Sequence, residues 1–249
     1  MLLLVLVTIL FGLVVGSFLN VVIHRVPRHE SIVWPASHCP HCGEPIRPLD
    51  NVPLISYLLL RGRCRNCKER ISARYPAVEA LNGLLFGAAA YEFGVSLELL
   101  PALVLISSLI VLAVIDLEHR LLPNVIVGPA ALTGLVLSIL ANPAGWWTYP
   151  LFALAVAGAL LVLALAIPGG MGMGDVKMGG MLGAFLGPYA ALAVFLGALI
   201  GAVSGGLLMA AGKVQRRSAL PFGLFMALGG VISLFVGPQL WSLYMNVVG

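Results

Sequence analysis

The sequence contains only three aspartates, and two of them stand at the edges of long apolar segments. Asp116 directly follows one apolar run, and Asp175 follows a Gly-Met-Gly tripeptide. A carboxylate at the centre of a membrane span costs roughly 2.5–3.5 kcal/mol on insertion scales, so such acids mark reaction or ion pathways. Either residue alone could equally be a helix cap or an ion-pair partner, because Arg120 and Lys177 are close in sequence. As a pair, the two aspartates predict a carboxylate dyad.

The chemistry predicted for this dyad is peptide hydrolysis. Two facing carboxylates do not readily ionise together, so they share a proton and titrate as a coupled pair. One then activates water as a general base, while the other, protonated, polarises the substrate carbonyl. Gly172 and Gly174 would let the backbone approach closely and bend beside Asp175. The chain has neither a GxSxG nor an HExxH motif, so we expect no covalent intermediate and no metal at the peptidase site. The third aspartate, Asp50, is expected to be a turn or cap residue.

The four cysteines form two CxxC pairs separated by 21 residues. This spacing is typical of a structural zinc site with four thiolate ligands. A redox pair would need only one CxxC, usually in a βαβ context that is absent from this sequence. His38 and His41 could substitute as ligands, but four thiolates already complete the site. The predicted ligands are Cys39, Cys42, Cys64 and Cys67.

The elements that must position these residues are membrane helices. The chain is 60% hydrophobic and 10% charged, whereas soluble domains carry about 25% charge. The sequence therefore predicts an all-α polytopic membrane protein with about eight transmembrane helices, one of them short or tilted. We expect a first anchor at 1–23, a small cytoplasmic zinc-binding insert at 24–75 and a membrane-embedded core at 76–249. The apolar segments lie at 2–23, 77–93, 99–115, 123–140, 149–167, 176–187 (the short one), 189–211 and 220–244.

The distribution of basic residues predicts the orientation. Nine of the 14 Lys and Arg residues fall within the insert, which the positive-inside rule places in the cytoplasm. The first apolar segment has neither a preceding basic region nor a small-residue cleavage site, so we expect an uncleaved anchor. Both termini would then lie outside, and both membrane aspartates on the cytoplasmic side. The bases form no soluble basic face, which argues against nucleic acid as a partner. The remaining bases, Arg120, Lys177, Lys213, Arg216 and Arg217, all fall in predicted cytoplasmic connections.

Several motifs, taken in order, resemble the type IV prepilin peptidases, which are intramembrane aspartyl proteases with a GxGD signature. That signature matches Gly172-Met173-Gly174-Asp175. The similarity extends over nearly the whole chain. The other matching segments are GSFLNVV at 16–22, the paired CxxC, RYPAVE at 74–79, ID at 115–116 with LPN at 122–124, and PFG at 221–223.

The resemblance implies a bifunctional enzyme of the bacterial cytoplasmic (inner) membrane. It would cleave the basic leader from type IV pilin or pseudopilin precursors at the cytoplasmic face, and then methylate the new N-terminal amine with S-adenosylmethionine. Asp116 and Asp175 map to the catalytic pair, with Gly172, Gly174 and Lys177 in the active-site loop. Methyl transfer is associated with the N-terminal part that carries the insert.

Glu79 is a candidate for the methyl-transfer step, because an acid at the start of a span could hold the substrate ammonium. It could equally pair with Arg74 or serve as a helix-start charge.

Three other interpretations remain open from the sequence. The chain could be a peptidase only, with the zinc insert as a structural lid or substrate-docking module. It could be a proton-coupled transporter, although transporters of this kind have paired broken helices and only one glycine-broken segment is found here. It could also be a zinc-bearing membrane scaffold, in which neither membrane aspartate would be needed.

Overall fold

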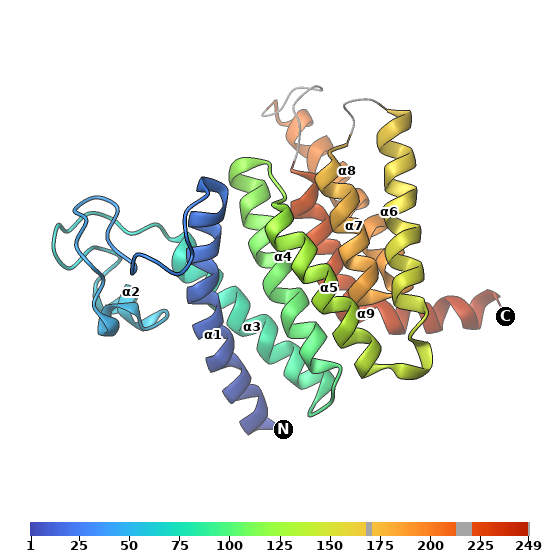
Figure 1. Ribbon diagram of the computed structural model, residues 1–249, viewed down its shortest axis with the longest axis horizontal. Helices are drawn as coiled ribbons and strands as arrows, with labels where there is room; N and C mark the ends of the chain where they lie inside the picture. Colours follow the sequence, from blue (N-terminus) through green and yellow to red (C-terminus); the bar gives the residue numbers. More distant parts are fainter. Residues whose placement is uncertain (168–170, 213–220, 249) are drawn as a thin grey trace. The chain divides into compact units, whose positions relative to one another are not determined.

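The computed structural model describes residues 1–167, 171–212 and 221–248, and the regular structure in this part of the chain is helical apart from two isolated β-bridges (Figure 1). The absence of a β-sheet there confirms the predicted all-α class. The chain packs as two compact units, Met1–Val95 and Ser96–Gly249. Each unit forms its own set of helix contacts, so each is described separately.

Unit 1 consists of two long helices and the insert between them. Helices α1 (Leu2–Arg25) and α3 (Arg74–Phe93) pack along each other. Their close approach depends on Gly16, because a Cβ there would lie 2.8 Å from the Cα of Glu79. The insert contains the short helices η1 (Val26–Arg28), η2 (Pro48–Asn51) and α2 (Ile55–Leu59).

Unit 2 is a bundle built around its shortest α-helix. Helix α7 (Met173–Leu186) packs against each of the other α-helices of the unit, and Met178, Met181 and Leu182 are fully buried. Its 14 residues rise only about 21 Å, against a hydrocarbon core of about 30 Å. The surrounding helices therefore shelter a helix that is too short to span upright. They are α4 (Leu99–His119), α5 (Asn124–Ala141), α6 (Thr148–Ala166), α8 (Tyr189–Ala210) and α9 (Phe222–Val248), with η3 (Pro143–Gly145) between α5 and α6.

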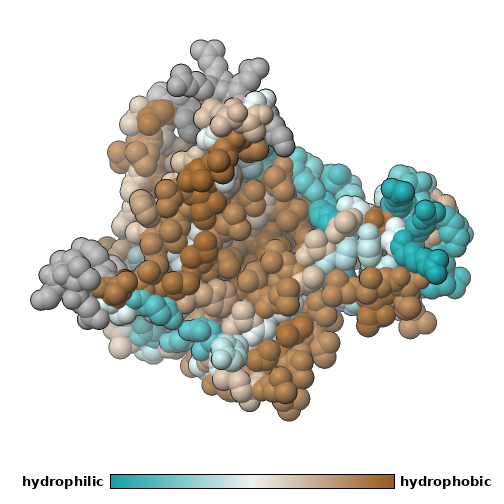
Figure 2. Space-filling model, turned by 180° about the vertical axis from the view of Figure 1, so that it is seen from behind, coloured by the Kyte–Doolittle hydropathy of each residue, from teal (hydrophilic) through white to brown (hydrophobic). Residues whose placement is uncertain are grey.

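The outer surfaces of the long helices are apolar, whereas hydrophilic side chains gather on the insert (Figure 2). On α1, Leu3 is 75% exposed and Leu10 is 63% exposed, and on α6, Leu154 is 75% exposed. Such surfaces are expected where lipid rather than water surrounds a helix. Six helices in the described ranges are long and apolar enough to cross a membrane, which confirms a polytopic membrane protein.

The number of spans stays a prediction. Helix α3 is 20 residues long but less apolar than those six, and α7 is too short. Every predicted apolar segment contains a helix, but several boundaries were wrong. Helix α3 begins at Arg74 rather than 77, and α7 begins at Met173 rather than 176, which places Asp175 inside its first turn. The predicted start at residue 220 and the bases Lys213, Arg216 and Arg217 lie outside the described residues.

The packing of α7 on α6 makes a testable prediction at Gly183. A Cβ at this position would overlap the backbone of Ala153, which cannot move aside as a flexible side chain can. We expect Gly183→Ala to lower the free energy of unfolding by about 1–3 kcal/mol, as overpacking does. Thermal unfolding in detergent measures this effect.

The matched control is Gly158→Ala on α6, where a Cβ would meet no atom within 4 Å. Relief of the poor helix propensity of glycine should leave this variant neutral or more stable, by up to about 1 kcal/mol. Equal stability of the two variants would contradict the packing described.

Candidate functional site

Asp116 lies in the last turn of α4 and faces the start of α9. Its side chain is 5% exposed, and its Oδ2 accepts a hydrogen bond from the backbone N–H of Leu224 at 3.0 Å. A Cβ at Gly223 would lie 2.9 Å from the same oxygen. The absence of a side chain at Gly223 therefore lets the first turn of α9 approach the carboxylate.

Asp175 lies in the first turn of α7 and is partly exposed. Its Oδ2 accepts a hydrogen bond from the N–H of Gly172 at 3.1 Å, and its own N–H donates to the Gly172 carbonyl at 3.1 Å. The residue thus caps the start of α7, as one of the alternatives considered from the sequence suggested. Asp116 also acts electrostatically on Asp175, which indicates that both carboxylates lie in the same part of unit 2.

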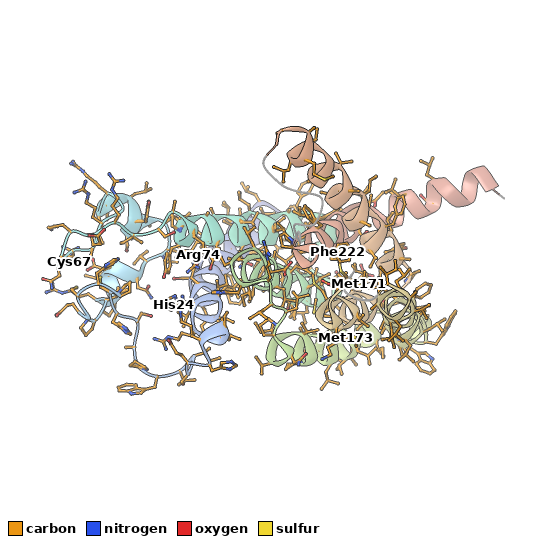
Figure 3. All side chains as sticks on the ribbon, turned by 90° about the horizontal axis from the view of Figure 1, so that it is seen from above. His24, Cys67, Arg74, Met171, Met173 and Phe222 are labelled. Atoms are coloured by element: carbon orange, nitrogen blue, oxygen red, sulfur yellow. The ribbon has the colours of Figure 1, made fainter. Side chains whose placement is uncertain are left out.

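Leu122 links the helix starts that carry these contacts. A Cβ at Gly174 would lie 3.0 Å from the Leu122 Cβ, and a Cβ at Gly223 would lie 2.9 Å from the Leu122 Cδ2. The side chain of Leu122 therefore fits between the beginnings of α7 and α9. Met171 and Phe222, labelled in Figure 3, precede and begin these two helices and pack against the same core.

Lys177 does not neutralise the dyad. Its Nζ donates to Oδ1 of Asn124 at 2.9 Å, which connects the second turn of α7 to the start of α5. Within the described ranges, neither Asp116 nor Asp175 forms an ion pair with Arg120 or Lys177. The donors that stabilise the two carboxylates are backbone N–H groups.

The four cysteines of the insert form one cluster. Their sulfur atoms all lie within 4.8 Å of one another, and the Cys39 and Cys67 sulfurs are 3.8 Å apart. Four thiolates at about 2.3 Å from a tetrahedral metal ion would be separated by about 3.8 Å. The cluster can therefore hold a metal ion, and neither His38 nor His41 belongs to it.

The two CxxC segments form equivalent turns. In the first, the N–H of Gly43 donates to the Cys39 carbonyl at 2.8 Å; in the second, the N–H of Lys68 donates to the Cys64 carbonyl at 3.1 Å. Gly43 and Lys68 both have a positive φ, of 72° and 62°. The equivalent turns direct all four thiols to one point.

The electrostatics of the insert act unequally on the thiols: they favour the thiolate at Cys64 but raise the pKa of Cys67 to about 11. Hydrogen bonds from the backbone N–H groups of Cys67 and Asn66 lower the pKa of Cys64 to about 7. Arg65, in the same turn, forms a two-point contact with Asp50, with N–O distances of 2.7 and 2.8 Å. This hydrogen-bonded pair lowers the pKa of Asp50. Asp50 therefore lies in a short helical turn, as predicted, and also connects η2 to the second CxxC turn.

Glu79 is buried on α3, at 8% exposure, and joins the insert to the long helices. Its Oε2 accepts a hydrogen bond from the N–H of Leu54 at 2.9 Å, and its carboxylate is also hydrogen-bonded to Ser17 of α1. The sequence also allowed Glu79 to be a partner of Arg74 or a simple helix-start charge. Neither of these two interpretations accounts for the contacts with Leu54 and Ser17.

Two family models match most of the chain. Residues 10–93 match the bacterial peptidase A24 N-terminal domain, and residues 103–207 match the type IV leader peptidase family. A Bacillus subtilis protein named prepilin leader peptidase/N-methyltransferase is 38% identical over 240 residues, covering 96% of each chain. The chain belongs to the type IV leader peptidase family. A Pseudomonas aeruginosa protein of the same name is 37% identical and covers 98% of this chain and 94% of its own.

A further relative of the same name, from Myxococcus xanthus, is 46% identical over 83% of this chain and 64% of its own. No solved structure matches the chain.

Three features of the candidate sites were not predicted from sequence. The segments containing Leu122, Gly223 and Asn20 were part of the family resemblance, but no role followed for them. Asn20 could have been noticed in the sequence, because it is a polar residue inside an apolar helix. The contacts of Leu122 and Gly223 join segments about a hundred residues apart, and no local pattern reports them.

The cysteine cluster predicts metal binding that depends on all four thiols and on pH. We expect Cys39→Ser and Cys64→Ser each to reduce the bound metal, measured by elemental analysis of the purified full chain, and to destabilise the insert. Metal binding requires deprotonated thiols, so lowering the pH from about 8 to about 5 should release the ion as Cys64 and its neighbours become protonated. Unchanged metal content in either variant would contradict a four-cysteine site.

Proposed function

We propose that this chain removes the leader peptide from type IV pilin or pseudopilin precursors and then methylates the new N-terminal amine. The observation that carries the peptidase assignment is the placement of Asp116 and Asp175 in the same part of unit 2, each accepting a hydrogen bond from a backbone N–H. The names of the relatives support both activities. A peptidase lacking methyl transfer is not favoured, since these relatives are named for both.

The two carboxylates have different roles in hydrolysis. The ionised one accepts a proton from water, which attacks the scissile carbonyl, while the protonated one donates a hydrogen bond to the carbonyl oxygen. Fixing Oδ2 of Asp175 to Gly172 leaves Oδ1 as the oxygen for this proton transfer. Gly172, Gly174 and Lys177 position the loop, and the carboxylates need no metal for the step.

The metal that best fits the insert is zinc. Thiolate ligands favour zinc or iron–sulfur clusters, and a closed tetrahedral set of four cysteines is typical of structural zinc. The insert has few apolar residues for a core of its own, so metal binding would supply much of its folding free energy.

The methyl donor, S-adenosylmethionine, fits a cavity of unit 1. This cavity has a volume of about 600 Å³ and is lined by the ends of α1 and α3 and by the insert. Its volume is within the usual range for small-molecule sites, about 300–1,000 Å³. Five arginines and five carboxylates line it, a mixture suited to a zwitterionic ligand. When bound, S-adenosylmethionine supplies the methyl group.

The functional segments and their orientation follow from this assignment. We place the first anchor at 1–23, the methyltransferase-associated zinc insert at 24–75 and the peptidase core at 76–249. In the bacterial inner membrane, both termini lie outside and both sites face the cytoplasm. The basic leader then stays at the cytoplasmic surface, while the apolar helix of the pilin lies in the bilayer.

The decisive experiment is cleavage of a purified prepilin by Asp116→Asn and Asp175→Asn. Loss of general acid–base catalysis should lower the rate by about 10²–10⁴-fold or more in each variant. Asp50→Asn is the matched control, because Asp50 pairs with Arg65 in the insert and should retain most of the peptidase rate. Full activity of either dyad variant, with a normal thermal midpoint, would exclude the mechanism.

The loop geometry makes a second prediction, at Gly174. A valine there would displace Leu122, so Asp175 would shift and cleavage should fall by about 10²-fold. Gly172→Ala is the control, because φ is −81° at this position and an added Cβ makes only an ordinary 3.4 Å contact with Asp175. Wild-type turnover by Gly174→Val would count against this account of the loop.

A further inference from the structure

The floor of the unit 1 cavity is a polar seam between α1 and α3. Ser17 and Asn20 lie about one turn apart on α1, and Tyr75 and Glu79 about one turn apart on α3; all four line the cavity. Ser17 is hydrogen-bonded to Glu79, and Asn20 donates to the Tyr75 carbonyl at 3.0 Å. His24 and Arg74, labelled in Figure 3, lie near the corresponding ends of the two helices.

Asn20 carries an acceptor with no partner. The residue is 2% exposed, and its Nδ2 donates to the carbonyls of Gly16, at 3.3 Å, and Tyr75. These two carbonyls fix the orientation of the amide, since the reversed orientation would place oxygen against oxygen. The remaining atom, Oδ1, is buried and accepts no hydrogen bond from any described residue. Leaving a buried acceptor unpaired is costly, so a ligand that supplies an N–H would restore the missing bond.

The neighbouring Glu79 defines the charge of that ligand. Its carboxylate lines the same floor, and its two contacts come from neutral donors, Ser17 and the Leu54 N–H. Together, an amide oxygen and a carboxylate provide two acceptors for a group with several N–H donors and a positive charge. A primary ammonium has both properties.

We propose that Asn20 Oδ1 and the Glu79 carboxylate bind the N-terminal ammonium of the processed pilin in this cavity. The inference rests on the proposed N-methyltransferase activity and assigns its amine site. Loss of one proton through Glu79 to solvent frees the nitrogen lone pair for methyl transfer. The N–CH₃ bond then forms as the methyl–sulfonium bond breaks, and the electron pair stays on sulfur as a thioether.

The test uses the full chain in detergent and two soluble peptides carrying the first residues of a mature pilin. One peptide has a free N-terminal amine, and the other is acetylated there. We expect the wild type to bind the free-amine peptide at least about tenfold more tightly, and Asn20→Leu and Glu79→Gln each to remove most of that preference. Glu79→Gln keeps an oxygen for the Leu54 N–H, so it provides a second variant should Asn20→Leu fold poorly.

Asn82→Leu is the matched control. Asn82 is a fully buried asparagine on α3 that donates to the Gly12 carbonyl of α1 at 2.7 Å, but it lies outside the cavity lining. This variant should keep the preference for the free amine. Loss of the preference in Asn82→Leu as well would overturn the proposal, because a general loosening of the α1–α3 pair would then explain the effect.

Binding of S-adenosylmethionine, measured separately by equilibrium dialysis, distinguishes the two sources of an ammonium group. Unchanged affinity for S-adenosylmethionine in Asn20→Leu, with loss of free-amine preference, supports the proposal. If the variant instead loses S-adenosylmethionine and keeps the peptide preference, the seam binds the amino group of the methyl donor and the proposal is wrong. Equal displacement of the free-amine peptide and of the acetylated peptide by an added leader peptide would also overturn the proposal.

Incorporation of labelled methyl groups into cleaved pilin by the wild type tests the underlying activity independently. Its absence would refute the proposed N-methyltransferase function, whereas its presence without free-amine preference would refute only the assignment of Asn20 and Glu79.

Discussion

Two carboxylates inside an apolar helical body require hydrogen-bond donors, and the starts of two helices provide them in unit 2. Asp116 accepts from Leu224 in the first turn of α9, and Asp175 accepts from Gly172 at the start of α7. Helix N-termini carry a partial positive charge, which favours an anion without a paired cation. A directly paired cation would hold a carboxylate ionised. Neutral donors leave the pair able to exchange a proton, which the proposed hydrolysis requires.

Helix α7, which holds Asp175 in its first turn, is short and buried. Its 14 residues are too few to span a bilayer upright, and the neighbouring helices of unit 2 cover it. Close packing follows, and Gly183 permits backbone contact with α6, while Leu122 fits against Gly174 and Gly223. Since Leu122 contacts the starts of both α7 and α9, a change in its position would shift the helix starts that hold both carboxylates. The geometry of the dyad therefore depends on helix packing more than on the loop alone.

In unit 1, a polar insert is attached to two apolar helices. The four cysteines replace a hydrophobic core by converging on one point. A series of polar contacts along α1 and α3 then joins the long helices to each other and to the insert, with Glu79 receiving the N–H of Leu54. The same contacts leave Asn20 Oδ1 unpaired beside a cavity. In this unit, the contacts that attach the insert also line a cavity.

The amino-acid sequence established the membrane class and the approximate helices, and it predicted the cysteine ligand set and the choice of Asp116 and Asp175. These depend on local composition, on short spacings and on the rarity of acids in apolar segments, all of which can be read along the chain. It did not determine the first turn of α7, the contact of Leu122 with Gly174 and Gly223, or the unpaired oxygen of Asn20. These features arise from the tertiary structure, because each depends on which atoms of distant segments meet, and close packing between helices has no local signature in the sequence.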